Sequence, residues 1–317
     1  MVSFNVVRDL VAAAPWGGEK AHVSPILKGY STDGKFVINL RGRHYLLKTF
    51  DLAQLDQKVQ EYGALEKMQH FKVKSSRPLE FGSWEQHGLG YMLLTYIDGK
   101  DAAEELPRYS VADQYQIGVQ AGRELRKIHE YLPEVEAASS WCERKTLKHR
   151  RYLDEYLALN VRIPGDERLL SFIDDNLHLM NGRPDGFQHD DFHVGNLIVQ
   201  DQQLAGVIDF NRIDWGDPIH DFLKVGIFSS EVSEPFSIGQ IHGYHGNDEP
   251  DEDFWRLYSL YLAMCLVSSV VWILKVKPEE LDVMMDKIVR VLEDHRHFED
   301  IIPKWYTEIS KLKGACK

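Results

Sequence analysis

Two short segments in the second half of the chain contain carboxylate and amide side chains suited to phosphoryl chemistry. The first, residues 188–196, reads QHDDFHVGN, and the second, residues 207–211, reads VIDFN. Phosphoryl transfer needs mainly positioning and charge neutralisation, because the protein does little covalent chemistry in it. A carboxylate must orient the hydroxyl that accepts the group, and oxygen ligands must hold Mg²⁺ on the phosphate oxygens. Asp191, Asn196 and Asp209 supply those three groups.

The spacing of these side chains follows a known catalytic pattern. His189, Asp191 and Asn196 stand at the intervals of the kinase catalytic loop, and Asp209 follows one expected hairpin later, where that pattern has its metal-binding aspartate. Residues 215–221 then read WGDPIHD. Together these segments resemble the motifs of the aminoglycoside phosphotransferase and choline kinase-like family, whose members typically read HGDxxxxN, then Ile-Asp, then Gly-Asp-Pro and a further Asp. The resemblance covers nearly the whole chain, because the strand-rich first hundred residues also fit.

This resemblance implies a fold and a set of catalytic roles. The fold is α+β and bilobal, like that of protein kinases, with a small antiparallel-sheet N-lobe containing one helix and a larger, mainly helical C-lobe. Asp191 would be the catalytic carboxylate, and Asn196 and Asp209 would be the ligands of Mg²⁺. The phosphoryl donor would be ATP or GTP, a choice that the sequence does not reveal.

A lysine expected at the nucleotide phosphates lies in the first lobe. Lys48, on the third predicted strand, occupies the place of the family's phosphate-contacting lysine, although alone it would be an ordinary strand-edge charge. Its expected partner is Glu61 on the following helix, with Glu66 as the alternative. Either glutamate could instead be a solvated charge on the helix face.

Two further segments are candidates for nucleotide binding. Ser31 and Thr32, in the loop 29–34, could donate backbone N–H and hydroxyl hydrogen bonds to phosphate oxygens, or that loop could be a plain turn. The nucleotide base would be held by main-chain groups from Thr95 to Ile97, where the last strand of the first lobe ends.

The elements that must position these groups follow from the pattern of apolar residues and turns. Strands are expected at 25–28, 35–40, 45–50, 78–81 and 91–96, and the glycines between 82 and 90 indicate a turn-rich connection. A helix is expected after Asp51, a plausible N-cap, because apolar residues recur there at helical spacing. Beyond Asp98 the pattern becomes helical, as at 111–130, with strands expected at 197–199 and 205–208. We therefore predict an N-terminal nucleotide-binding lobe over 1–97 and a C-terminal catalytic and substrate-binding lobe over 98–317.

The catalytic segment departs from the family pattern at one position and permits a different chemistry. Asp190 stands where the family has glycine, so it either faces the active site beside Asp191 or points away and pairs with a basic side chain. His189 and His193 could form a zinc site of a metallohydrolase. However, histidines four residues apart converge on a metal when they lie on a helix, and Gly195-Asn196 indicates an irregular loop.

Composition limits the class of partner and the compartment. The chain has 317 residues, 44% of them hydrophobic and 27% charged, which excludes a disordered chain. Its net charge of −12 disfavours nucleic acid and anionic membranes. The three cysteines form no CxxC pair, and no signal segment is evident, so we expect a cytoplasmic protein, monomeric or weakly dimeric. The uncharged run 257–274 is expected to be a buried helix rather than a membrane span.

The function expected from these observations is transfer of the γ-phosphoryl group of a nucleotide to a hydroxyl of a small molecule. The negative net charge favours a cationic, aminoglycoside-like acceptor, for which Asp214, Glu231 and Glu234 are candidate contacts. The acidic run 248–253 is better explained as a helix N-terminus. Choline-, homoserine- and amino-sugar-type kinases share the same catalytic loop, and a nucleotide-binding pseudokinase is a further alternative.

Overall fold

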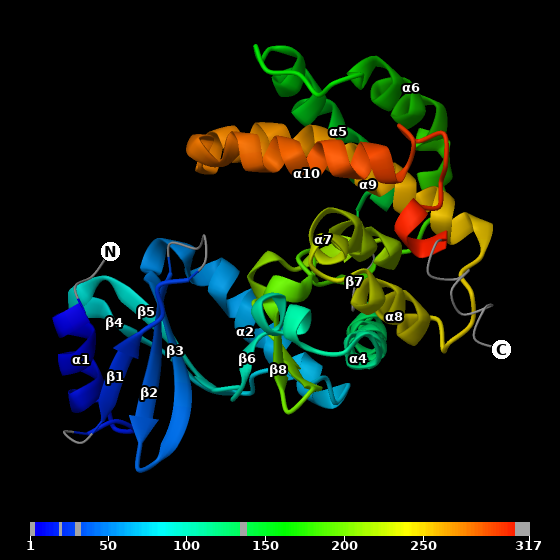
Figure 1. Ribbon diagram of the computed structural model, residues 1–317. Coiled ribbons are helices and arrows are strands. Elements are labelled where there is room, and N and C mark those ends of the chain that lie inside the picture. Colours follow the sequence, from blue (N-terminus) through cyan, green and yellow to red (C-terminus); the bar gives the residue numbers. More distant parts are fainter. Residues whose placement is uncertain (1–3, 19–20, 29–32, 134–137, 308–317) are drawn as a thin grey trace. The chain divides into compact units, whose positions relative to one another are not determined.

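The computed structural model of the chain describes residues 4–18, 21–28, 33–133 and 138–307, which Figure 1 traces. The chain divides into two compact units, Met1–Gly99 with Ala205–Asn211, and Lys100–Leu204 with Arg212–Lys317. The first unit is therefore discontinuous in sequence. Residues 205–211 were expected in the second lobe, whereas they group with the first unit.

A five-stranded antiparallel sheet forms the centre of the first unit, with the strand order β1-β2-β3-β5-β4. The strands are β1 (His22–Pro25), β2 (Gly34–Leu40), β3 (Arg43–Asp51), β4 (Pro78–Trp84) and β5 (Leu89–Thr95). Apolar side chains of the sheet pack with Val7 and Val11 of helix α1 (Phe4–Ala13), forming one core cluster with Ile38 and Leu47 at its centre. The sequence pattern predicted β2, β3 and β5 well, because their inward residues are long and apolar.

Three features of this unit differ from the expectation. Helix α1 was not anticipated, and the first strand covers 22–25 instead of 25–28, with Leu27 92% exposed. The glycines at 82 and 90 lie within β4 and β5, where the rings of Tyr91 and Phe50 cover them so closely that a Cβ would clash. These two glycines therefore make room for cross-strand aromatic rings, and only the turn around Gly88 reverses the chain.

Helix α2 (Leu55–His70) follows β3 through one turn of 3-10 helix. Asp51 caps that turn, since its carboxylate accepts a hydrogen bond from the backbone N–H of Ala53 at 2.8 Å. Unusually for a helix on the surface of a small unit, α2 buries two charged residues, Lys58 and Glu61. Burial of charge is costly unless it is paired, so these residues must have partners nearby.

The second unit consists mainly of helices (Figure 1). They are α3 (Ala102–Glu105), α4 (Val111–His129), α5 (Trp141–Leu157), α6 (Asp166–Asn176), α7 (Ser230–Val232), α8 (Glu234–Tyr244), α9 (Glu252–Val276) and α10 (Leu281–Asp294). Short strands accompany them: β6 (Lys100–Asp101) pairs with β8 (Leu197–Gln200), which neighbours β9 (Gln203–Val207), and β7 (Gly186–Gln188) pairs with β10 (Asp214–Gly216). The catalytic segment lies between β7 and β8.

Helices α4 and α8 approach each other at backbone distance because four glycines line their contact. Gly118 and Gly122 on α4 face Gly239 and Gly243 on α8. A Cβ added at any of the four would lie 2.0–2.2 Å from a backbone oxygen of the opposite helix. This close approach fixes α4, and with it the strand β7 that α4 contacts.

Helix α9 contains the long uncharged run noted in the sequence. Asp251 caps its start by accepting from the backbone N–H of Phe254 at 2.8 Å, so that the acidic run does form a helix N-terminus. Length and composition alone would let α9 cross a membrane, and it is the single such helix among the described residues. Because 78% of its most apolar window is buried inside the protein, it serves as a core helix.

Candidate active site

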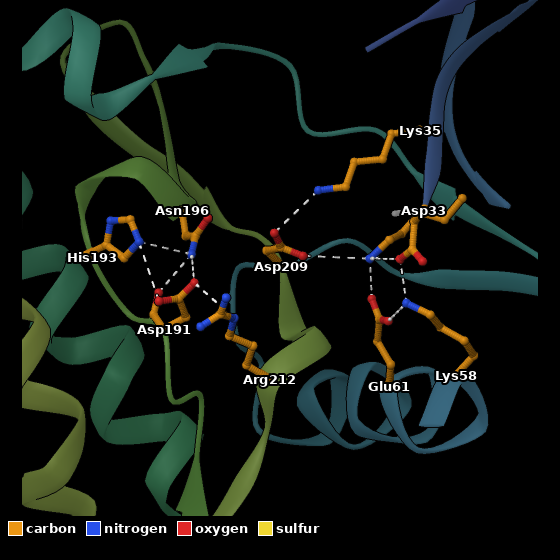
Figure 2. Close-up of polar contacts among 10 residues, drawn as sticks. Asp33, Lys35, Lys58, Glu61, Asp191, His193, Asn196, Asp209 and Arg212 are labelled. Atoms are coloured by element: carbon orange, nitrogen blue, oxygen red, sulfur yellow. Dashed lines mark hydrogen bonds and ion pairs between the residues drawn. The ribbon is translucent and has the colours of Figure 1, made fainter. Parts of the chain in front are cut away.

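Asp191 and Asn196 are held together in the loop between β7 and β8 (Figure 2). The side-chain Nδ2 of Asn196 donates to the backbone oxygen of Asp191 at 2.8 Å and to its carboxylate Oδ2 at 3.2 Å. The amide of Asn196 is therefore oriented, and its Oδ1 is the atom that remains to act as an acceptor or a metal ligand. The structure thus brings together two of the residues that the sequence identified.

Two cations lie beside the Asp191 carboxylate. Lys224 Nζ is 3.0 Å from Oδ1, and Arg212 Nε is 3.9 Å from Oδ2. Burial would raise the pKa of Asp191, but the neighbouring cations Lys224 and Arg212 outweigh that effect and lower it to about 2. The carboxylate is consequently ionised at neutral pH. Lys224 was not predicted from the sequence, although a single lysine in the apolar run 222–228 was an available signal.

His193 is neutral in this environment. Its Nδ1 accepts a hydrogen bond from the backbone N–H of Gly195 at 3.1 Å, and its Nε2 lies 3.6 Å from Asp191 Oδ1. Burial lowers the pKa of His193 to about 4, more than the nearby carboxylate raises it. His193 therefore caps the turn at 194–196 and does not act as a cation at neutral pH.

The loop backbone is anchored by Asp221, the last acid of the WGDPIHD segment. Its carboxylate accepts from the backbone N–H groups of His189 at 2.9 Å and Asp190 at 2.7 Å, and from Nε2 of His129 at 2.9 Å. Asp217 has a different structural role, since it pairs with Arg183 at 2.7 Å and accepts from Tyr261 at 2.8 Å. Both acids are fully buried, so they position the loop rather than contact a substrate.

Asp190 points to a basic partner, which is the second of the two orientations considered for it. Its Oδ1 lies 3.2 Å from Nδ1 of His220, and Nε2 of His220 contacts Lys145 Nζ at 2.6 Å. Burial would raise the pKa of Asp190, but His220, Lys224 and Lys148 lower it below its ordinary range. The backbone of Asp190 has a φ of 56°, the left-handed region in which glycine is favoured. The left-handed backbone conformation at this position thus explains why the family motif HGDxxxxN has glycine there.

We expect substitutions of Asp190 to separate the backbone effect from the side-chain effect. Asp190→Gly loses the contact with His220 but relieves the left-handed conformation, whereas Asp190→Ala loses the contact and keeps the strain. Asp190→Ala should therefore be less stable than Asp190→Gly by about 1 kcal/mol, measured by urea denaturation. Equal stability of the two variants would show that the loop relaxes out of this conformation.

In the first unit, Lys48 on β3 pairs with Glu61 on α2, the partner preferred from the sequence. Lys48 Nζ donates to Glu61 Oε1, while Glu66 is exposed. Lys58 donates to Glu61 Oε2 at 3.1 Å and also to Asp33, completing a buried network of two lysines and two acids (Figure 2). Burial would lower the pKa of Lys48, but Glu61, Asp209 and Asp33 raise it overall, so the ammonium remains charged. Its contact with nucleotide stays a prediction.

Asp209 belongs to the same unit and faces two lysines from the sheet. Lys35 Nζ donates to Asp209 Oδ2 at 3.4 Å, and Lys48 Nζ lies 3.8 Å from Oδ1. Lys35 and Lys48 are direct cross-strand partners on β2 and β3, which explains why both reach one carboxylate. Lys35, Asp33 and Lys58 were not predicted from the sequence, because their roles depend on this register and on the placement of α2.

The remaining nucleotide-site candidates are placed as follows. Ser31 and Thr32 lie outside the described residues. Thr95 ends β5, and its Oγ1 accepts from the backbone N–H of Arg77 at 2.8 Å. Ile97 packs against Gly206, where a Cβ would lie 2.6 Å from its Cδ1. Neither contact tests whether these residues bind a nucleotide base.

The side chains nominated for Mg²⁺ have the chemistry that this ion requires. Mg²⁺ takes hard oxygen ligands, and Asn196 Oδ1 and the Asp209 carboxylate are such donors. Zinc would need a different set, and no group of three or more His, Cys, Asp or Glu side chains in the described part of the chain could hold a metal ion. The metallohydrolase alternative, which depends on His189 and His193, therefore has no structural support.

Comparison with known proteins establishes the class to which this fold and site belong. The chain is a member of the phosphotransferase enzyme family, whose model matches residues 22–258. The protein is accordingly a kinase, with the bilobal α+β kinase-like fold that the sequence indicated. Among curated proteins, no sequence matches the chain.

Three solved structures illustrate the fold. A choline/ethanolamine kinase family protein from Mesorhizobium loti is 17% identical, with a TM-score of 0.68 over 94% of this chain and 97% of that one. A GDP complex of aminoglycoside 2'-phosphotransferase-IIIa is 13% identical, with a TM-score of 0.67 over 91% and 98%. A thermostable mutant of aminoglycoside phosphotransferase APH(4)-Ia, with ADP and hygromycin B, is 11% identical, with a TM-score of 0.66 over 90% and 97%. At these identities the likeness concerns the fold alone.

Proposed function

We propose that the protein transfers the γ-phosphoryl group of a nucleoside triphosphate to a hydroxyl group of a small molecule. The observation that carries this proposal is that the Asp191 carboxylate is both ionised and held in a fixed position. Its carboxylate is ionised, fixed by Asn196 and Lys224, and held on a loop whose backbone Asp221 anchors. A carboxylate so fixed can accept a hydrogen bond from an acceptor hydroxyl and orient its oxygen toward phosphorus.

The proposed chemical step forms one P–O bond, breaks another and moves one proton. The acceptor oxygen forms a bond to the γ-phosphorus as the bond between that phosphorus and the β,γ-bridging oxygen breaks, releasing the nucleoside diphosphate. Asp191 takes the hydroxyl proton. With a pKa near 2, this carboxylate is a weak base, so it accepts the proton as the new P–O bond forms rather than before it.

We further propose that Lys48 contacts the nucleotide phosphates and that Glu61 holds the lysine in position. Solved relatives contain ADP or GDP, which supports a purine nucleotide as the donor without distinguishing ATP from GTP. Asn196 and Asp209 would hold Mg²⁺, which neutralises charge on the phosphate oxygens when it is bound. The main-chain groups from Thr95 to Ile97, with Ser31 and Thr32, remain our proposed nucleotide contacts.

A nucleotide-turnover assay tests the proposed function. We expect Mg²⁺-dependent consumption of ATP or GTP, slow when water is the acceptor and faster when a suitable hydroxyl compound is present. Thermal shift with each nucleotide should show binding under the same conditions. Nucleotide binding without nucleotide turnover, for every hydroxyl compound assayed, would contradict the proposal and identify a nucleotide-binding pseudokinase.

The charge of the acceptor has to be judged from the side chains around Asp191 rather than from the whole chain. The net charge of −12 favoured a cationic, aminoglycoside-like acceptor. Solved relatives bind acceptors such as hygromycin B and gentamicin, but at 11–15% identity these ligands do not transfer to this chain. A cationic acceptor therefore remains a proposal that the acceptor assay tests.

A further inference from the structure

Basic side chains surround the catalytic loop within the second unit. Lys224 and Arg212 flank Asp191, as described above. Lys145, on α5, reaches the loop through His220, which contacts Asp190. Lys148, one turn further along α5, acts electrostatically on both Asp190 and Lys145. The protein as a whole is acidic, so this concentration of positive charge is local.

The acidic groups in this region are already engaged with basic partners. Asp191 is paired with Lys224, Asp190 faces His220, and Asp214 lies 3.8 Å from Lys148. With Asp221, which anchors the loop backbone, four acidic side chains balance the four basic ones. Lys224, Arg212 and Lys148 each pair with a carboxylate. Lys145 instead contacts the His220 imidazole, whose pKa burial and Lys145 lower, and forms no ion pair within the described part of the chain.

Several acids that a polycationic acceptor could use have partners within the protein. Glu231 forms an ion pair with Lys287 of α10. In the acidic run before α9, Asp251 caps the helix and Glu252 pairs with Arg256 at 2.5 Å. Glu249 accepts a hydrogen bond from the hydroxyl of Tyr306. These four acids therefore have basic, hydroxyl or backbone partners in the described structure.

Lys145 is held in a way that suits ligand binding. Its ammonium lies 5.7 Å from the centre of the Trp141 ring and donates to His220 Nε2 at 2.6 Å, which leaves further N–H groups to donate. Burial, with the neighbouring Lys148, lowers the pKa of Lys145 to about 8, so the ammonium is still mostly protonated at neutral pH. Lys148 is more accessible, with 44% of its side chain exposed. Since residues three apart share a helix face, both ammonium groups lie on the same side of α5.

We propose that the acceptor is a small hydroxy compound bearing a single negative charge, of the carboxylate class, and that Lys145 and Lys148 bind that charge. A carboxylate would give Lys145 the anionic partner that the described side chains around it do not provide. Only the imidazole of His220 separates Lys145 from Asp190 of the catalytic loop. A hydroxyl group on a small molecule whose carboxylate binds Lys145 would therefore be able to reach Asp191. This inference rests on the proposed phosphotransferase function and specifies its acceptor.

Matched acceptors and matched variants test the inference. The panel consists of hydroxycarboxylates, the corresponding neutral amides and the corresponding amino alcohols, each assayed with Mg²⁺ and ATP or GTP. Lys148→Gln removes one of the two proposed contacts at an accessible position, so its fold should be retained. Arg150→Gln makes the same charge change two residues along α5, where helical spacing directs the side chain to the opposite side. Lys145→Met removes the second contact.

We expect hydroxycarboxylates to be the best acceptors. Lys148→Gln should raise their KM by about 10-fold, since one close charge contact is worth roughly that much, while kcat and the KM for nucleotide change less than twofold. Lys145→Met should raise the same KM, and Arg150→Gln should behave like the wild type. The amides should respond to none of these substitutions.

The contrary results are distinguishable from failure of the proposed function. Preferential phosphorylation of amino alcohols, or an unchanged KM for carboxylates in Lys148→Gln and Lys145→Met, would overturn the inference while leaving the phosphotransferase function intact. A third result would also overturn the inference. The enzyme would hydrolyse nucleotide in an Asp191-dependent manner, but no hydroxycarboxylate would be phosphorylated and none would change the rate of that hydrolysis. Absence of all nucleotide turnover would instead refute the proposed function itself.

Discussion

Asp191→Asn is expected to lower the rate of phosphoryl transfer by at least about 100-fold, the usual effect of losing a positioned base. The amide has the same shape as the carboxylate but cannot take the proton of the acceptor hydroxyl. Its amide group would also face Asn196 Nδ2 and Lys224, both of which now donate to a carboxylate oxygen. Single-turnover measurement of product, with nucleotide affinity measured separately, isolates the chemical step.

Asp201→Asn provides a matched control for this substitution. Asp201 is exposed in the turn between β8 and β9, ten residues beyond the catalytic aspartate, and its left-handed φ of 48° is tolerated by asparagine. The rate of phosphoryl transfer by the Asp201→Asn variant should remain within twofold of the wild type. Near-normal turnover in Asp191→Asn would remove Asp191 from the proposed mechanism.

Asp209→Asn is expected to reduce the affinity for Mg²⁺-nucleotide by at least about 10-fold, because Mg²⁺ would lose an anionic oxygen ligand. Asparagine is preferred to alanine here, since Asp209 has a left-handed φ of 68° that alanine would strain. Calorimetric titration with ATP and GTP in the presence of Mg²⁺ measures this loss.

The same titration in EDTA is the informative control. Without metal, the Asp209 carboxylate repels the nucleotide phosphates, whereas Lys35 and Lys48 beside it attract them. The neutral variant should therefore bind metal-free nucleotide as well as the wild type or better. An equal loss of affinity with and without Mg²⁺ would mean that Asp209 has only a structural role.

Much of the fold could be predicted because the spacing of apolar residues within each short segment indicates its secondary structure. The strands β2, β3 and β5 have long apolar inward faces, and α4 has its apolar residues at helical spacing behind the N-cap Ser110. The first strand was placed three residues late because Ile26 and Leu27 are apolar, yet Leu27 lies in solvent. Glycines within β4 and β5 suggested turns, since the aromatic rings that cover them come from other strands.

The candidate site was predictable where a motif defines it and not where tertiary contacts do. Asp191, Asn196 and Asp209 stand at motif spacing, and the pairing of Lys48 with Glu61 was expected from the resemblance to the kinase family. Lys145 and Lys148 look like ordinary helix charges in the sequence. Their importance arises from His220, which lies 75 residues after Lys145 in the chain, and no spacing rule connects those positions.

The discontinuity of the first unit has a consequence for how the protein is made. Val207 donates its backbone N–H to the oxygen of Lys74 at 2.7 Å and forms a parallel bridge with Ser75, and Asp209 supplies the carboxylate between Lys35 and Lys48. A nascent chain cannot complete this unit when residue 99 leaves the ribosome, because residues 205–211 do not yet exist. The unit becomes complete only late in translation, and a fragment ending at Gly99 would lack both the bridge and the carboxylate.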